Sequence, residues 1–199
     1  MIIYMVRHGE VPLNQKKVAF NALDESLTEE GRRQTEKLAD RLASVKLDAI
    51  FVSNTKRGHE TALPIAKEKN ISPKTDERLN DCNYGIFANL TKERAEEKYP
   101  QAFRKREEDK YNVPIPEGES FADVATRWRS FFADLKKKKL ENILIVTHGT
   151  NLKVFLMEYL RYNVDDADKV YFKNTSVSIF SVSNTGVRLL RRNDTSHLN

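Results

Sequence analysis

The stretch Ile2-Ile3-Tyr4-Met5-Val6-Arg7-His8-Gly9, at the start of the chain, decides how the rest is interpreted. Residues 2–6 are apolar and rich in β-branched side chains, which is typical of a short buried strand. Two basic side chains follow at once, and the glycine after them lets backbone amides come close to a bound anion. The stretch therefore predicts a buried strand that ends at a ligand site.

A second segment repeats this arrangement. Residues 142–147 form another apolar run, predicted to be a buried strand, and His148-Gly149 follows it. Ligands of open α/β sheets bind beyond the carboxyl ends of the strands, near the point where the strand order reverses. We therefore expect His8 and His148, which are 140 positions apart (148 − 8), to meet in one crevice.

Predicted helices and strands alternate through the remainder of the chain. Helices are expected over residues 28–44, 57–69, 121–135 and 151–161, the third with Ser120 as its N-cap and an aromatic stripe that faces the core. Pro64 is expected to kink the second helix or to divide it. Strands are expected over residues 48–52, 175–182 and 187–191, the last two joined as a hairpin. This alternation predicts an α/β fold: a three-layer sandwich with a mainly parallel central sheet, helices on both faces, and room for an antiparallel strand at one edge.

A single domain is predicted over residues 1–199, because the length suits one core and no linker or repeat interrupts it. Residues 91–111 are charged and helical in composition, and the stiff Pro114-Ile115-Pro116 follows them. We therefore expect a small helical excursion, at about residues 87–116, that covers the site at the strand ends and selects what binds there. Its aromatic side chains are expected to pack rather than to bind: Phe87, Tyr99 and Phe103.

The composition excludes several classes of function. The chain carries a formal net charge of +5, but acidic and basic residues are interleaved, so no basic stripe predicts binding to nucleic acid. A small anionic partner suits the excess better. The single Cys82 permits no internal disulfide and no cysteine zinc site, and it is expected to be buried and inert. No pair of histidines has the spacing of metal ligands, so neither a metal nor a cofactor is predicted.

The apolar run at residues 2–6 is far too short for a signal peptide or a membrane span. We therefore expect a cytoplasmic protein with no membrane partner. The sequence indicates no oligomeric state.

Six short motifs, taken in their order, resemble one known family. They are Arg7-His8-Gly9-Glu10 with Asn14 beyond it, Leu27-Thr28-Glu29-Glu30-Gly31-Arg32-Arg33-Gln34, Ser53-Asn54-Thr55-Lys56-Arg57 followed by Glu60-Thr61-Ala62, Gly118-Glu119-Ser120, Val146-Thr147-His148-Gly149 and Asn193-Asp194-Thr195-Ser196-His197-Leu198. Together they are similar to the histidine phosphatase superfamily, in its phosphoglycerate-mutase-like branch and of the compact phosphatase type. The resemblance spans nearly the whole chain.

The resemblance implies a phosphomonoester hydrolase that works through a phosphohistidine on His8, without a metal, on a small phosphorylated metabolite. Phosphoryl transfer gathers negative charge on three equatorial oxygens, so positioned cations and donors carry the catalysis. A neutral imidazole is available near pH 7, since its reference pKa is about 6.5. The residues implied to hold the phosphoryl group and the substrate are Arg7, Asn14, Arg57, His148 and Gly149.

The leaving alkoxide needs a proton, and the resemblance implies that Asp81 supplies it. In the family a glutamate usually stands after a leucine and before a glycine, and the matching segment here is Leu79-Asn80-Asp81-Cys82-Asn83-Tyr84-Gly85. Aspartate is one methylene shorter, and its reference pKa of about 3.9 is lower. Burial or nearby negative charge must raise that pKa for Asp81 to donate at neutral pH. A role in a turn or a cap is the structural alternative for this residue.

Other functions stay open at this point. A 2,3-bisphosphoglycerate-dependent phosphoglycerate mutase would return the phosphoryl group to a bound acid instead of water. Mutases of the family typically carry a longer segment between the acid and the second histidine, whereas here that span is 67 residues (148 − 81), which favours a phosphatase. A non-catalytic phosphate-binding module is supported only by Asp81 in place of glutamate. A metallohydrolase lacks a set of ligands.

Overall fold

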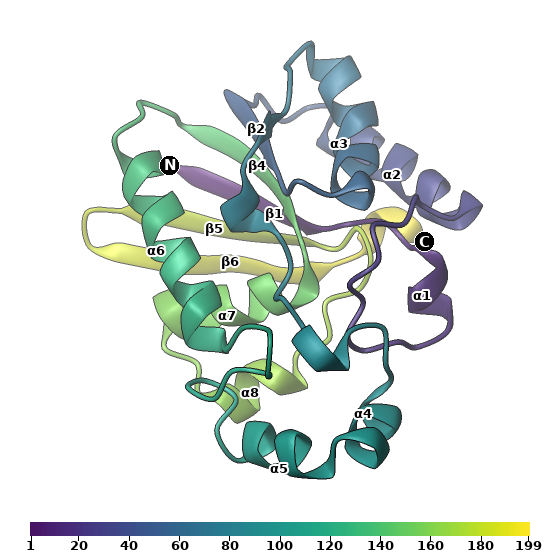
Figure 1. The fold of residues 1–199 in the computed structure, drawn as a ribbon. Helices are drawn as coiled ribbons and strands as arrows, with labels where there is room; N and C mark the ends of the chain where they lie inside the picture. Colours follow the sequence, from purple (N-terminus) through teal and green to yellow (C-terminus); the bar gives the residue numbers. More distant parts are fainter.

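The computed structural model describes residues 1–199 and places one mixed sheet between two layers of helices (Figure 1). Its strands are β1 (Ile2–Arg7), β2 (Ala49–Val52), β3 (Lys74–Thr75), β4 (Asn142–Thr147), β5 (Val177–Ser183) and β6 (Gly186–Asp194). They are ordered β3-β2-β4-β1-β5-β6. The first four in this order are parallel, whereas β5 runs antiparallel to β1 and β6 antiparallel to β5. The predicted fold class is confirmed, with two antiparallel strands rather than one at the edge.

Alternate residues of the central strands face opposite helical layers. Ile3 and Met5 of β1 join a cluster of 28 buried residues with the helices α6 (Phe121–Lys136) and α7 (Gly149–Leu160). Val6, the next residue, joins a separate cluster of 13 buried residues with α2 (Glu29–Leu42) and α3 (Lys56–Lys69). Because side chains alternate along a strand, a run that is apolar at every position needs cover on both faces. The two layers supply that cover and leave the strand ends free to carry a site.

Polar caps fix where the helices begin. Oγ of Ser120 accepts from the backbone N of Asp123 at 3.2 Å, while the Asp123 carboxylate accepts from the Ser120 backbone at 2.9 Å, which makes a capping box. The predicted N-cap of α6 is confirmed. Pro64 lies inside α3 without dividing it, so of the two predicted effects, a kink or a division, the division is wrong. The buried face of α3, which includes Ala62 and Ile65, packs against the sheet and holds the helix together across the one lost backbone donor.

The excursion predicted over residues 87–116 contains two helices, α4 (Lys92–Lys98) and α5 (Pro100–Glu108). They separate at Tyr99, because the residue before a proline avoids the helical conformation. As expected, aromatic side chains of this segment pack on one another: the Phe87 ring centroid lies 6.1 Å from that of Tyr99 and 6.0 Å from that of Phe103. Figure 1 shows α4 and α5 near α8 (Val164–Lys169), apart from the helices that cover the sheet.

Several short elements have no counterpart among the predicted ones. Besides β3 and α8, they are α1 (Pro12–Gln15) and the 3-10 segments η1 (Glu77–Leu79), η2 (Gly85–Phe87) and η3 (Ser196–Leu198). Each is too short to show a hydrophobic period of its own. None of the helices has the length and apolar character that crossing a membrane requires.

Candidate active site

The carboxyl ends of β1 and β4 lie side by side. The two strands are parallel neighbours, with Arg7 opposite Thr147. The residues that follow, His8 and His148, therefore enter the same crevice, and their ring centroids are 5.2 Å apart. The two residues are 3% and 0% exposed. The predicted meeting of these two histidines is confirmed.

The His8 imidazole has one engaged nitrogen and one free nitrogen. Its Nδ1 lies 2.7 Å from the carbonyl oxygen of Gly9, and because a carbonyl only accepts, Nδ1 must carry the proton. Nε2 then holds the lone pair. Burial lowers the pKa of His8 well below its ordinary value, and the guanidinium groups of Arg7 and Arg57 lower this pKa further. At pH 7, His8 is therefore a neutral imidazole whose Nε2 can act as a nucleophile.

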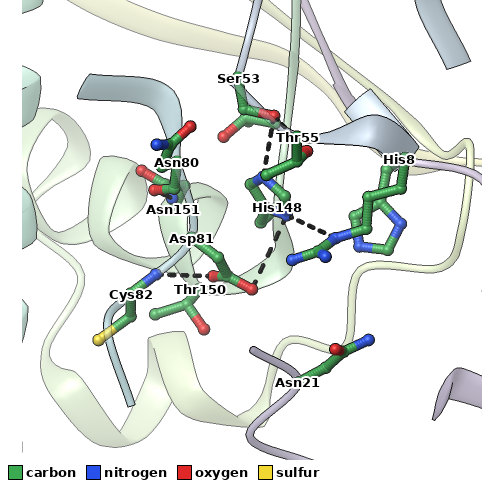
Figure 2. Close-up of polar contacts among 12 residues, drawn as sticks. His8, Asn21, Ser53, Thr55, Asn80, Asp81, Cys82, His148, Thr150 and Asn151 are labelled. Carbon is green, nitrogen blue, oxygen red and sulfur yellow. Dashed lines mark hydrogen bonds and ion pairs between the residues drawn. The ribbon is translucent and has the colours of Figure 1, made fainter. Parts of the chain in front are cut away.

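His148 is held in the opposite tautomer. Nε of Arg57 donates to its Nδ1 at 3.4 Å, so Nε2 carries the proton and donates to Oγ of Ser53 at 3.0 Å (Figure 2). Oγ of Ser53 lies in turn 3.0 Å from Oγ1 of Thr55. Burial, and then the charge of Arg57, lower the pKa of His148 as well. Residues just after β2 thus fix the orientation of this ring.

Two arginines bring cationic donors to the histidines. Arg57 is only 3% exposed, and its Nη1 donates to the carbonyl oxygen of Leu23 at 2.6 Å. Arg7 is anchored in the same way by the carbonyl oxygen of Phe172 at 2.6 Å, while its buried Nε has no partner. A buried donor without a partner is unfavourable unless a ligand completes it. The Arg7 side chain therefore has a free buried donor for a bound anion.

Asn14 presents an amide donor to the same cavity. Its Oδ1 accepts from the backbone N of Val11 at 3.2 Å and from Nδ2 of Asn174 at 3.1 Å, so its own amino group remains for a ligand. Asn174 also donates to the carbonyl oxygen of His8 at 2.9 Å. Sequence reasoning misses Asn174, because it lies in the segment between α8 and β5 and no local pattern connects it to residues 8 and 14.

The glycines that follow the two histidines serve different purposes. Gly149 begins α7, two residues earlier than predicted, and it lines the cavity with Thr150, so the positive end of that helix dipole lies at the site. The backbone N of Gly9 instead donates to Oγ1 of Thr61 at 2.9 Å. A Cβ atom on Gly9 would meet the carbonyl oxygen of Gly31 at 2.9 Å, so this glycine permits α2 to approach. The predicted approach of the Gly9 amide to an anion is wrong.

Asp81 reaches the cavity from the loop between η1 and η2. Its Oδ1 accepts from the backbone N of Cys82 at 3.0 Å and from the Tyr84 hydroxyl at 3.2 Å (Figure 2 shows the first). Burial raises the pKa of Asp81, and the charge of Arg57 opposes that rise only in part. Asp81 is the only carboxylate in the lining of this cavity of about 140 Å³, whose other residues are Arg7, His8, Asn14, Val18, Ala19, Asn21, Arg57, Tyr84, Gly149, Thr150, Lys153, Tyr171 and Phe172.

Arg127 of α6 holds the loop that carries Asp81. Its Nη1 donates to the carbonyl oxygens of Arg78 at 2.7 Å and Asn80 at 2.9 Å, and its Nη2 donates to that of Asp81 at 3.3 Å. Its Nε pairs with the Glu119 carboxylate at 2.9 Å. Sequence reasoning misses Arg127, because a basic residue between the apolar positions of an amphipathic helix looks like an ordinary surface residue.

Cys82 is buried, and burial raises the pKa of its thiol, in line with the expected inert role. No three or more His, Cys, Asp or Glu side chains are grouped so that they could hold a metal ion. The cationic side chains that line the site are Arg7, Arg57 and Lys153, and the start of α7 adds its dipole.

Together, this fold and this site define a phosphatase of the histidine class. The chain belongs to the histidine phosphatase superfamily (branch 1), which residues 3–195 match. Phosphoserine phosphatase 1 of Hydrogenobacter thermophilus is 29% identical over 197 residues, covering 98% of this chain and 93% of that protein. YhfR of Bacillus stearothermophilus superimposes with a TM-score of 0.88 and 28% identity, covering 100% of this chain and 99% of its own. The phosphoserine phosphatase of Entamoeba histolytica, solved in complex with 3-phosphoglyceric acid, shares the fold with a TM-score of 0.87, 23% identity and coverage of 100% and 99%.

Proposed function

We propose that this phosphatase hydrolyses small phosphomonoesters through a phosphohistidine on His8, without a metal ion. The observation that carries the proposal is the free Nε2 of His8 in one cavity with the unpartnered, buried Nε of Arg7. A nucleophile with an available lone pair, surrounded by cationic donors, is what the transfer of an anionic phosphoryl group requires.

In the first step, Nε2 of His8 attacks phosphorus and the bond from phosphorus to the ester oxygen breaks. Arg7, Arg57 and the amide of Asn14 donate to the equatorial oxygens, and the N-terminus of α7 adds its dipole. Burial raises the pKa of Asp81, which favours its protonated form, and in this mechanism the protonated carboxyl gives its proton to the leaving oxygen, which departs as an alcohol. His148, with Nδ1 as an acceptor, acts by orienting the guanidinium of Arg57.

In the second step, a water molecule attacks the phosphohistidine. Asp81, now a carboxylate, takes a proton from the water, and the bond from phosphorus to nitrogen breaks. Inorganic phosphate leaves, while His8 returns to its neutral form and Asp81 to its protonated form. The two steps together consume one ester and one water and leave the site unchanged.

The substrate is proposed to be a small phosphorylated metabolite. The relatives reported above include phosphoserine phosphatases, one of them in complex with 3-phosphoglyceric acid. The cavity of about 140 Å³ suits a phosphoryl group with a few further atoms. No residue of the segment 87–116 lines that cavity, but four residues of this segment line a neighbouring one. We therefore assign substrate selection to this segment.

Hydrolysis of p-nitrophenyl phosphate and of a panel of metabolite phosphomonoesters, with and without excess EDTA, tests the proposal. Inorganic phosphate should be released at the same rate in both conditions. Loss of activity with EDTA that returns on addition of a metal ion would overturn the metal-free mechanism. Interconversion of 2- and 3-phosphoglycerate without net release of phosphate would instead identify a mutase.

A further inference from the structure

A second cavity adjoins the proposed phosphate site. It has a volume of about 150 Å³, and Ala19, Tyr84, Thr150 and Lys153 line both cavities. Tyr84 and Thr150 join across the boundary through their hydroxyls, 2.8 Å apart. A substrate whose phosphoryl group lies at His8 can therefore extend past Thr150 and Lys153, which lie on adjacent turns of α7, into the second cavity.

The second cavity contains a buried guanidinium that pairs with nothing. Arg106 of α5 is 5% exposed, and its buried Nε and Nη1 have no hydrogen-bond partner. The guanidinium carbon lies over the face of Phe121, 4.7 Å from the ring centroid. A buried charge without a partner destabilises a fold, and a cation–π contact offsets only part of that cost. The position of Arg106 thus calls for an anion that the chain itself does not provide.

The other charged groups of this cavity do not meet that need. Nζ of Lys110 and Nζ of Lys153 each lie 2.7 Å from the Asp168 carboxylate, and Lys92 lies 4.0 Å from it. Glu107 pairs with Lys110 at 2.8 Å. The lining therefore has four cations against two carboxylates, a surplus of two positive charges (4 − 2), and both carboxylates are already engaged by lysines.

We propose that Arg106 and Lys153 bind a carboxylate of the substrate, so that this enzyme prefers phosphomonoesters that carry a carboxylate a few bonds from the phosphate. This inference rests on the proposed function and extends it to the class of substrate. The guanidinium fork matches a planar carboxylate, and the small volume admits such a group. A phosphate dianion suits the cavity less well, because Glu107 and Asp168 share the lining.

A matched pair of esters isolates the carboxylate. Glycerol 3-phosphate differs from 3-phosphoglycerate only by a hydroxymethyl group in place of the carboxylate. The wild-type enzyme should show a kcat/KM for 3-phosphoglycerate at least about 10-fold above that for glycerol 3-phosphate, as expected for one charge-assisted hydrogen-bonded contact. Equal values for the two esters would overturn the inference.

The variant Arg106→Met should lower the ratio of these two kcat/KM values by about 10- to 100-fold, mainly through KM for 3-phosphoglycerate. Methionine keeps the apolar stem and removes a buried charge, so the variant should fold. Arg104→Met is the matched control, because Arg104 is an exposed residue of the same helix, and it should leave the ratio unchanged. Equal loss with both esters in Arg106→Met, or an unchanged ratio, contradicts the proposed contact.

Ligand-induced shifts in melting temperature separate this inference from the proposed function. In the His8→Ala variant, which cannot turn over, 3-phosphoglycerate should raise the melting temperature more than glycerol 3-phosphate does, and adding Arg106→Met should remove the difference. If wild type hydrolyses no phosphomonoester but this difference is present, the proposed function fails and the carboxylate site stands. If hydrolysis is present but the two ligands give equal shifts, only the carboxylate site fails.

Discussion

Nδ1 of His148 and Oδ2 of Asp81 lie 3.8 Å apart in the candidate active site (Figure 2). This separation is too long for a hydrogen bond, so the histidine does not take the proton of the carboxyl group. The other oxygen of Asp81 accepts from the Cys82 backbone and the Tyr84 hydroxyl. Oδ2 therefore accepts no hydrogen bond within the protein, and it is the oxygen from which the proposed mechanism takes the proton for the leaving group.

The variant Asp81→Asn should slow the hydrolysis of alkyl phosphates by about 10² to 10⁴, the usual contribution of a general acid. With p-nitrophenyl phosphate the burst of phosphohistidine formation should slow much less, since nitrophenolate leaves without a proton. Rapid-quench kinetics with both substrates measures the two burst rates. Asp81→Glu should restore much of the alkyl phosphate activity, because it returns an acid to the loop. Equal losses in both bursts would show that Asp81 is structural.

The variant His8→Ala should abolish turnover and also remove an acid-labile, base-stable phosphoryl adduct that rapid quenching traps in wild type. The reason is that Nε2 of His8 is the free lone pair in the cavity. His59→Ala is the control, because His59 is exposed and lies outside the cavity, and it should keep both turnover and adduct. Labelling that persists without His8 would move the nucleophile elsewhere.

Stability should fall when the pH drops below about 6.5. Burial lowers the pKa of His8 and of His148 in the folded protein, whereas both return to about 6.5 in the unfolded chain. Between these values the unfolded chain binds more protons, so the free energy of unfolding decreases by up to about 1.4 kcal/mol per pH unit for each histidine. Urea unfolding between pH 7 and pH 5, in buffer without phosphate, measures this slope.

Substitution of one buried histidine isolates that effect. His148→Gln should flatten the dependence of unfolding free energy on pH, because the proton that His148 takes up on unfolding is no longer part of it. His59→Gln, at an exposed histidine, should leave the slope of wild type. The same slope in all three proteins would mean that other groups cause the acid sensitivity.

Loss of Arg127 should destabilise the protein by about 2 to 4 kcal/mol, because it breaks a partly buried ion pair and leaves three carbonyls of the Asp81 loop without their donor. Arg129→Ala on the same helix should cost less than about 1 kcal/mol, since the Arg129 side chain that pairs with Glu158 is half exposed. Urea unfolding compares Arg127→Ala with that control. Arg127→Ala should also lower kcat for alkyl phosphates by a larger factor than it lowers the burst rate with p-nitrophenyl phosphate. An unchanged kcat would exclude a positioning role for Arg127.

The sequence predicts the sheet and the meeting of the two histidines because both depend on short-range patterns. Buried strands at residues 2–6 and 142–147 show as apolar runs, and the carboxyl ends of parallel strands share one edge whatever lies between them. Ser120 is recognised as a cap because the hydrogen bonds that define it span only three residues.

The residues that sequence reasoning misses depend on contacts between distant segments. Asn174 contacts His8 across 166 positions, and Arg127 reaches Asp81 across 46, so neither has a local pattern. Arg106 looks like one more charge on a solvated helix, and only the packing of α5 shows that its guanidinium is buried. The role of Gly9 is mispredicted for the same reason, because the backbone that crowds it belongs to Gly31 in another element, α2.

The position of β4 in the sheet has a consequence for how the protein is made. This strand lies between β1 and β2, although the chain supplies it only after residue 141. While the ribosome is still adding the first 140 residues, β1 has no neighbouring strand and β2 has only the two-residue β3, so the edges that β4 will later cover stay open to other chains. Premature termination before β4 should therefore yield aggregates rather than a smaller folded unit, and synthesis of the last third of the chain sets when both histidines first come together.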